Sequence, residues 1–155
     1  MALTQLPTRD EVDPRYTWND TSVFASVDEW SAELARLLND LGDVSGYQGR
    51  LADGPAVLAD ALRTLYDLRG RAEKVLVYAF LTESVDRSNQ AATAHAGQAG
   101  SLIGQMEGAI AYFEPELLGI GQERLTEWLT AEPELAVYGH YVDDLFRRQA
   151  HVRSP

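Results

Sequence analysis

Two long stretches of the chain carry apolar residues at the three- and four-residue steps that place them on one face of a helix. The first opens at Asp53-Gly54-Pro55, where an aspartate cap satisfies free amide groups and a proline presets the first turn. Its apolar positions are Val57, Leu58, Ala61, Leu62, Leu65, Leu68, Ala72, Val75, Leu76 and Ala79. Charged residues lie mostly on the opposite side, so the pattern predicts an amphipathic helix over about residues 54–84.

The second stretch, over about residues 88–113, has a small residue at every fourth position, and Asp86 or Ser88 can cap its start. The small residues are Ala92, Ala96, Gly100, Gly104 and Gly108. Because glycine inside a helix costs about 1 kcal/mol relative to alanine, the stripe predicts a neighbouring helix packed closely against it. We therefore expect a long antiparallel helix pair with a shared core. A membrane dimerisation face is the alternative, but Gln98, Gln105 and Glu107 among the glycines argue against lipid.

Shorter elements flank the pair, so the sequence predicts one all-α domain over residues 1–155. Residues 1–25 lack a sustained period and predict an extended arm with turns, before a helical body over residues 26–155. Ser26 and Glu29 match a capping box that starts a helix through Trp30, which we expect to end at Gly42. A loop should then cover residues 43–51. Further helices are expected at about 121–130 and 134–149, after a break at Glu114-Pro115-Glu116.

Composition excludes several functional classes. The net charge of −11, without a stripe of lysine or arginine, makes nucleic-acid binding unfavourable. The longest apolar run, from Val75 to Leu81, falls short of the roughly 20 residues that a membrane-spanning helix needs. No cysteine is present and no apolar leader opens the sequence, so we expect neither disulfides nor secretion, and a cytoplasmic location.

Motifs for common reactions are absent: the chain has no G-x-S-x-G, no G-x-x-x-x-G-K-[ST] and no H-E-x-x-H. Of its three histidines, His95, His140 and His151, only His140 has carboxylates at helical spacing, at Asp143 and Asp144. That group is either a weak metal site or, as we favour, a surface histidine with a helix-side ion pair. We therefore assign no catalytic and no metal-binding residue, and the substrate-binding residues are unknown. The acid pairs Glu29 with Glu33 and Glu114 with Glu116 are interpreted as solvated helix faces.

A series of short motifs runs along almost the whole chain. They are Leu6-Pro7-Thr8-Arg9, Tyr16-Thr17-Trp18-Asn19-Asp20-Thr21 with Phe24, Glu29-Trp30, Tyr47-Gln48-Gly49-Arg50-Leu51, Tyr78-Ala79-Phe80-Leu81, Phe113-Glu114-Pro115-Glu116-Leu117-Leu118, Tyr138-Gly139-His140-Tyr141-Val142-Asp143-Asp144-Leu145-Phe146-Arg147 and His151-Val152-Arg153-Ser154. In this order they resemble the N-terminal region of the oligoendopeptidase F family of zinc metallopeptidases, in the thimet oligopeptidase-like superfamily.

The resemblance implies a helical N-terminal domain that helps to form a substrate channel, facing a larger C-terminal catalytic domain of the same polypeptide. In such enzymes H-E-x-x-H supplies two zinc ligands and the glutamate that activates the metal-bound water, and a downstream glutamate completes the site. No residue of this sequence matches that motif. Zinc and the hydrolysis of short peptides are thus implied for the full-length enzyme, with no cofactor in this chain.

A different class of function stays open, namely a free-standing helical scaffold or protein-interaction module without catalysis. With the catalytic domain absent, surface that it normally covers is expected to favour self-association.

Overall fold

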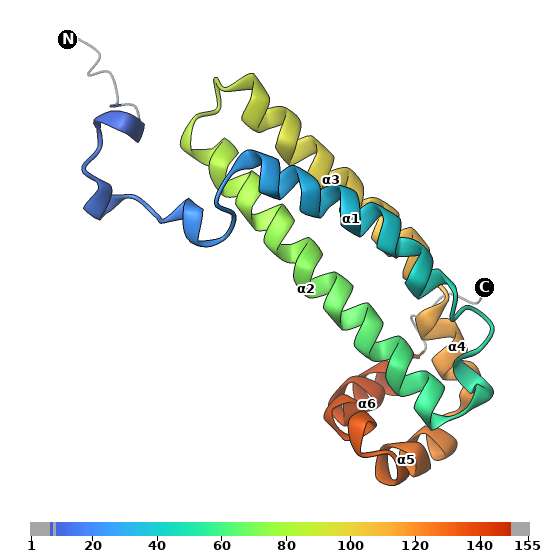
Figure 1. Cartoon of the computed structure of the whole chain (residues 1–155). Coiled ribbons are helices and arrows are strands. Elements are labelled where there is room, and N and C mark those ends of the chain that lie inside the picture. The colour runs from blue at the N-terminus through green and yellow to red at the C-terminus, as the bar shows by residue number, and fades with distance from the viewer. Residues whose placement is uncertain (1–6, 8, 150–155) are drawn as a thin grey trace. The chain divides into compact units, whose positions relative to one another are not determined.

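The computed structural model describes residue 7 and residues 9–149, and every regular element in that part of the chain is a helix. The α-helices are α1 (Val27–Ser45), α2 (Pro55–Val85), α3 (Gln90–Ile110), α4 (Phe113–Ile120), α5 (Gln122–Ala131) and α6 (Gly139–Arg147) (Figure 1). Short 3-10 helices are η1 (Arg9–Glu11), η2 (Pro14–Tyr16), η3 (Asp20–Ser22), η4 (Leu51–Asp53) and η5 (Pro133–Tyr138). The predicted all-α class is confirmed. Leu6 and Thr8 of the first motif and His151-Val152-Arg153-Ser154 lie outside the described residues.

Contacts between residues divide the described chain into two compact units, and the single-domain assignment stays a prediction. The first unit contains the residues up to Leu38 together with Gly70–Gly104. The second contains Asn39–Arg69 together with the residues from Gln105 onward. No helix among the described residues is long and apolar enough to cross a membrane.

The first unit is built around Trp30, which is 1% exposed. Its part of α2 runs antiparallel to α3 and to α1 (Figure 1). The indole Nε1–H of Trp30 donates to the carbonyl oxygen of Val75 in α2 at 2.9 Å, and its ring lies 4.8 Å from that of His95 in α3. Arg71 of α2 adds an ion pair with Glu33 of α1, at 2.7 Å between Nε and Oε1. One tryptophan thus contacts both of the other helices.

The capping box at the start of α1 is confirmed. The Ser26 hydroxyl accepts from the Glu29 amide at 3.2 Å, and the Glu29 carboxylate accepts from the Ala25 amide at 2.7 Å. The serine and the glutamate together therefore satisfy amides at the helix start.

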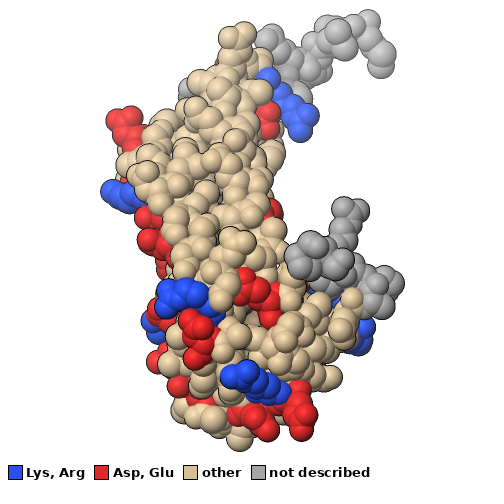
Figure 2. Space-filling model, turned by 90° about the vertical axis from the view of Figure 1, so that its right-hand side faces the viewer, with Lys and Arg blue, Asp and Glu red and all other residues tan. Residues whose placement is uncertain are grey.

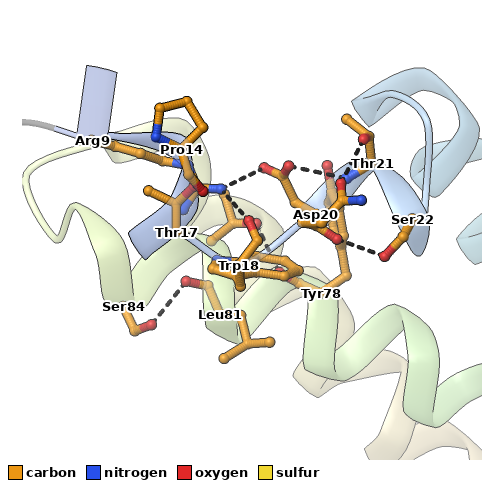
Figure 3. Close-up of polar contacts among 12 residues, drawn as sticks. Arg9, Pro14, Thr17, Trp18, Asp20, Thr21, Ser22, Tyr78, Leu81 and Ser84 are labelled. Carbon is orange, nitrogen blue, oxygen red and sulfur yellow. Dashed lines mark hydrogen bonds and ion pairs between the residues drawn. The ribbon is translucent and has the colours of Figure 1, made fainter. Parts of the chain in front are cut away.

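The N-terminal arm folds into the turns η1 to η3 and docks on Tyr78 of α2. The rings of Phe24 and Trp18 meet the Tyr78 ring edge-on, at centroid distances of 5.3 and 6.2 Å. Arg9 donates to the Trp18 carbonyl oxygen at 2.8 Å and pairs with Asp20 at 3.4 Å (Figure 3). The Trp18 Nε1–H is buried without a hydrogen-bond partner among the described residues. The expectation that the arm's aromatic residues dock is met by Trp18 and Phe24, whereas Tyr16 is 79% exposed.

In the second unit, α4 holds the loop that follows α1. The Glu116 carboxylate accepts from the amides of Gly49 at 2.6 Å and Leu51 at 3.5 Å. The side chain of Leu51 in η4 and that of Leu117 in α4 are both fully buried. Gly49 has φ +77°, a backbone conformation that glycine adopts without steric cost. Two of the motifs found in the sequence, around residues 49 and 116, therefore meet in space.

The predicted end of α1 at Gly42 is wrong, because the helix continues to Ser45. The extra turn carries Val44, whose side chain is fully buried. The Val44 carbonyl oxygen accepts a hydrogen bond from the Tyr47 amide at 3.2 Å and a second one from the Tyr112 hydroxyl. Burial of the valine and these bonds offset the cost of a glycine inside the helix.

The long pair was predicted closely, since α2 and α3 lie within three residues of the expected bounds. Of the ten apolar positions predicted for α2, all but Val57 and Leu76 are buried. The second helix ends at Ile110, before the expected break, and Pro115 lies in the first turn of α4. Proline is tolerated there because the first amides of a helix have no partner within it.

The role predicted for the glycine stripe of α3 is wrong. Gly100, Gly104 and Gly108 are exposed, and a Cβ added at any of them would meet no atom of a neighbouring element within 4 Å. A four-residue step advances about 400° at 3.6 residues per turn, so the stripe drifts by about 40° per step. It begins in the core at Ala92 and Ala96 and then turns outward. The residues that stay buried after these are Ala99, Leu102, Met106 and Ile110.

We predict that Gly100→Ala raises the free energy of unfolding by about 0.5–1 kcal/mol, because alanine favours the helix and meets open space. Gly49→Ala is the matched control and should lower it by about 1–2 kcal/mol, because an L-residue is strained at positive φ. Urea denaturation of both variants checks the pair. A destabilising Gly100→Ala would show that the stripe packs against another element.

Replacing tryptophan by phenylalanine should lower the free energy of unfolding much more at Trp30 than at Trp18. Trp30→Phe removes a hydrogen bond and leaves a cavity, so we expect a loss of about 2 kcal/mol or more. Trp18→Phe releases a buried unpaired donor, whose burial costs about 1–3 kcal/mol, so its net change should stay within about 1 kcal/mol. Urea unfolding followed by circular dichroism measures both. Equal losses would contradict the different roles of the two N–H groups.

Candidate functional site

The histidines do not gather into a reactive site in the described part of the chain. His95 lies against the Trp30 ring, His140 is exposed, and His151 is outside the described residues. Within residues 9–149 no group of three or more histidine or acidic side chains is placed to hold a metal ion. The chemistry of a metal-bound water therefore has no donor set in this part of the chain.

The carboxylates that follow His140 do not complete a metal site with it. Asp144 accepts from Arg148 Nε at 2.6 Å and also from the Arg147 guanidinium. These two hydrogen bonds lower the pKa of Asp144 below its usual value and keep the carboxylate ionised. Asp144 thus pairs with two arginines, whereas the sequence suggested a helix-side ion pair of His140.

Three of the four glutamates in the predicted acid pairs have structural partners outside their own helix turn. Glu33 binds Arg71, and Glu116 binds the amides of the loop after α1. Glu114 lies 3.6 Å from Arg148. The interpretation of these positions as solvated faces missed those contacts. Sequence spacing within one helix cannot reveal them, because each partner lies far away along the chain.

A cavity of about 320 Å³ opens on the second unit, next to Tyr141 of α6. Leu65, Ile110 and Phe113 give it an apolar lining, and Arg69 approaches Glu107 across it at 3.7 Å. Burial and the nearby Glu114 charge raise the pKa of Tyr141 to about 12, so its hydroxyl stays protonated at neutral pH. The lining offers hydrogen bonds and apolar contact, but no nucleophile beside a general base.

A second depression of the same unit, of about 410 Å³, is more polar. Tyr47 donates a hydrogen bond to Asp60, which also pairs with Arg63, and Arg63 reaches Glu134 at 3.1 Å. The Asp60 hydrogen bond is the largest cause of a raised Tyr47 pKa. Asp60, Arg63 and Glu134 each have an oppositely charged side chain beside them. Like the first cavity, this depression can bind a ligand, but its lining has no nucleophile beside a general base.

The surface of α3 in the first unit carries no charge. From Gln90 to Gly104 the helix contains no acidic residue, lysine or arginine, although the whole protein has a net charge of −11. Its exposed side chains are small or are neutral amides and hydroxyls, at Gln90, Ala91, Thr93, Ala94, Gln98 and Ser101. Figure 2 views the molecule from the side on which α3 lies and shows few charged atoms over that part of the surface. Such a surface can approach another chain without desolvating ions.

Comparison with known proteins relates the chain to one group of peptidases. The family model described as Oligopeptidase F matches residues 116–155. Oligopeptidase PepF of Bacillus subtilis is 30% identical over 150 residues, which are 97% of this chain and 22% of that protein. Group B oligopeptidase PepB of Streptococcus agalactiae is 28% identical over 146 residues, which are 94% of this chain and 24% of that protein.

A solved structure gives the same result. The crystal structure of oligoendopeptidase-F from Enterococcus faecium matches 83% of this chain and 26% of that chain, with a TM-score of 0.77 and 28% sequence identity. The chain thus spans about a quarter of the length of these relatives. It resembles the N-terminal region of oligoendopeptidase F, as the motifs indicated.

Two partly buried tyrosines should make the fold sensitive to alkaline pH. Burial, with the Glu116 charge as a smaller cause, raises the pKa of Tyr112 to about 12, as for Tyr141, whereas a tyrosine in the unfolded chain ionises near about 10. Because the unfolded state loses the proton first, the stabilisation is complete below pH about 10 and is lost as pH rises towards about 12. The free energy of unfolding, measured across this range, should fall.

Tyr112→Phe should make that fall shallower, and at neutral pH it should cost about 1 kcal/mol for the lost bond to Val44. Tyr16→Phe, at an exposed ring, is the matched control and should leave the slope unchanged. Tyrosinate absorbance of the folded protein provides an independent titration. Identical slopes for the wild type and Tyr112→Phe would contradict the assignment.

Proposed function

We propose that this chain is the N-terminal part of a zinc metalloendopeptidase of the oligoendopeptidase F type. One observation carries the proposal: similarity extends over 94–97% of the chain but only about a quarter of each relative. Under this proposal the helices form part of the wall of a channel that admits short peptides. Bond cleavage is assigned to the remainder of the polypeptide, and the protein is placed in the cytoplasm.

The described residues of this chain do not fit a zinc ion. No suitable group of ligands occurs among the described residues, and Asp144 is already held by two arginines. Zinc and the glutamate that acts on its bound water therefore belong to the remainder under this proposal, and no step of the hydrolysis is assigned to a residue of this chain. The contribution of this chain is to bind, orient and enclose.

Two kinds of structural feature support the proposal of a channel wall, namely helices fixed by buried contacts and surfaces that can contact a peptide. Long helices tied together by Trp30, and a loop fixed by Glu116, give surfaces whose shape is set by buried contacts. The two cavities of the second unit and the uncharged surface of α3 are able to contact a peptide without modifying it. Such a part restricts which substrates reach a catalytic centre, and it need not touch the reacting atoms.

The second candidate is a free-standing helical scaffold or interaction module. Exposed apolar side chains together with the lack of a reactive pair in the described residues favour it as the alternative. Sequencing the gene beyond Pro155 separates the two functions. An open frame that contains H-E-x-x-H supports the peptidase, and a stop codon supports the scaffold.

We expect the isolated 155-residue chain to leave a quenched fluorescent peptide intact, with or without added zinc, because it lacks the ligands and the base. The polypeptide encoded by the complete gene should cleave the same peptide, and a chelator should abolish that cleavage. A hydrolytic activity that copurifies with the isolated chain and is removed by the chelator would overturn the assignment of bond cleavage to the remainder of the polypeptide.

A further inference from the structure

We propose that an exposed apolar ridge at the end of α2 is the surface on which the remainder of the same polypeptide docks. This inference rests on the proposed function, since it requires a longer chain. The α2 ridge consists of Val77, Phe80, Leu81 and Val85, which are exposed by 42%, 49%, 41% and 42%. All four belong to the first unit.

The ridge lies on one face of a helix that is apolar on both sides. Its members follow three- and four-residue steps, which keep them on a common face. The opposite face carries the buried residues Val75, Tyr78 and Ala79. A helix segment that is hydrophobic all round is typical of a buried position, whereas a helix at the surface has one polar face.

The same face of α2 is charged one turn earlier. Glu73 and Lys74 are exposed there, at four and three residues before Val77. This face therefore carries charges in one turn, and over the next two turns Ser84 is the polar residue among the four apolar ones. Position on the helix alone does not account for the change, so the apolar turns indicate contact with another surface.

The N-terminal arm flanks the ridge and does not cover it. Trp18 and Phe24 both pack on Tyr78, which belongs to the opposite, buried face of α2. Even with the arm in place, Phe80 is half exposed. The occupant must come from outside the described residues.

Size favours an occupant in the same polypeptide over a second copy of this chain. A stable interface between separate proteins uses roughly 20–30 residues a side, and the ridge has four. Within one polypeptide the two surfaces share a high effective concentration, so smaller and weaker contacts are sufficient. The relatives provide such a polypeptide, because about three quarters of their length lies outside the region matched by this chain.

Cysteine labelling tests the proposal, because the 155-residue chain contains no cysteine. Phe80→Cys is prepared in this chain and in the polypeptide encoded by the complete gene, and maleimide modification at position 80 is followed by peptide mass spectrometry. Ala35→Cys, at an exposed position of α1 in the same unit, is the matched control. We expect both thiols to react at similar rates in the short chain. In the full polypeptide, position 80 should slow by about tenfold or more and position 35 should not change.

Two results overturn the proposal. Equal labelling of position 80 in the short and full polypeptides would show that the ridge stays open. Protection at position 80 in the short chain that increases with its concentration would identify a second copy as the occupant. Leu81→Cys repeats the test at a neighbouring position, so that a local effect of one substitution does not decide the result.

Failure of the inference differs from failure of the proposed function. If the complete gene lacks H-E-x-x-H, or if the full polypeptide bearing Ala35→Cys cleaves no peptide, the peptidase proposal fails. If that polypeptide is active and position 80 labels as fast as in the short chain, only the docking surface is wrong.

Discussion

The indole of Trp30 connects the three helices of the first unit. A buried tryptophan removes a large apolar surface from water, but its N–H must find an acceptor, and the Val75 carbonyl oxygen accepts it at 2.9 Å. The bond fixes the position of α1 along α2, and the contact with His95 fixes the position of α3 beside them. The arm adds to this unit further along α2, where Trp18 and Phe24 dock on Tyr78.

In the second unit, a carboxylate and a tyrosine hydroxyl hold the end of α1 and the segment that follows it by binding their backbone. Glu116 accepts from two loop amides, and Tyr112 donates to the Val44 carbonyl oxygen at the end of α1, so side chains of the α4 region bind the backbone of this part of the chain. The left-handed backbone at Gly49 presents its amide to the carboxylate. This arrangement gives a physical reason for the motifs around residues 49 and 116 to occur together in one sequence.

Local rules predicted what depends on neighbours along the chain. The capping box at Ser26 and Glu29 and the buried face of α2 were predicted correctly, because caps and helical periodicity act within one or two turns. The stripe at Gly100, Gly104 and Gly108 was misinterpreted, since equal four-residue spacing ignores the drift of about 40° per step. The end of α1 and the partners of Glu33 and Glu116 depend on tertiary contacts. The two cavities were not foreseeable, because each lining joins residues that lie far apart along the chain.

Asp144 shows how a carboxylate that stabilises the fold becomes less suited to act as a general acid or base. A general acid or base must exchange a proton near neutral pH. An arginine beside a carboxylate favours its charged form, as the lowered pKa of Asp144 illustrates, and so removes it from that role. Glu33 and Glu114 have arginine partners as well, and Glu116 is engaged by backbone amides. These carboxylates hold helices and loops of the two units in place.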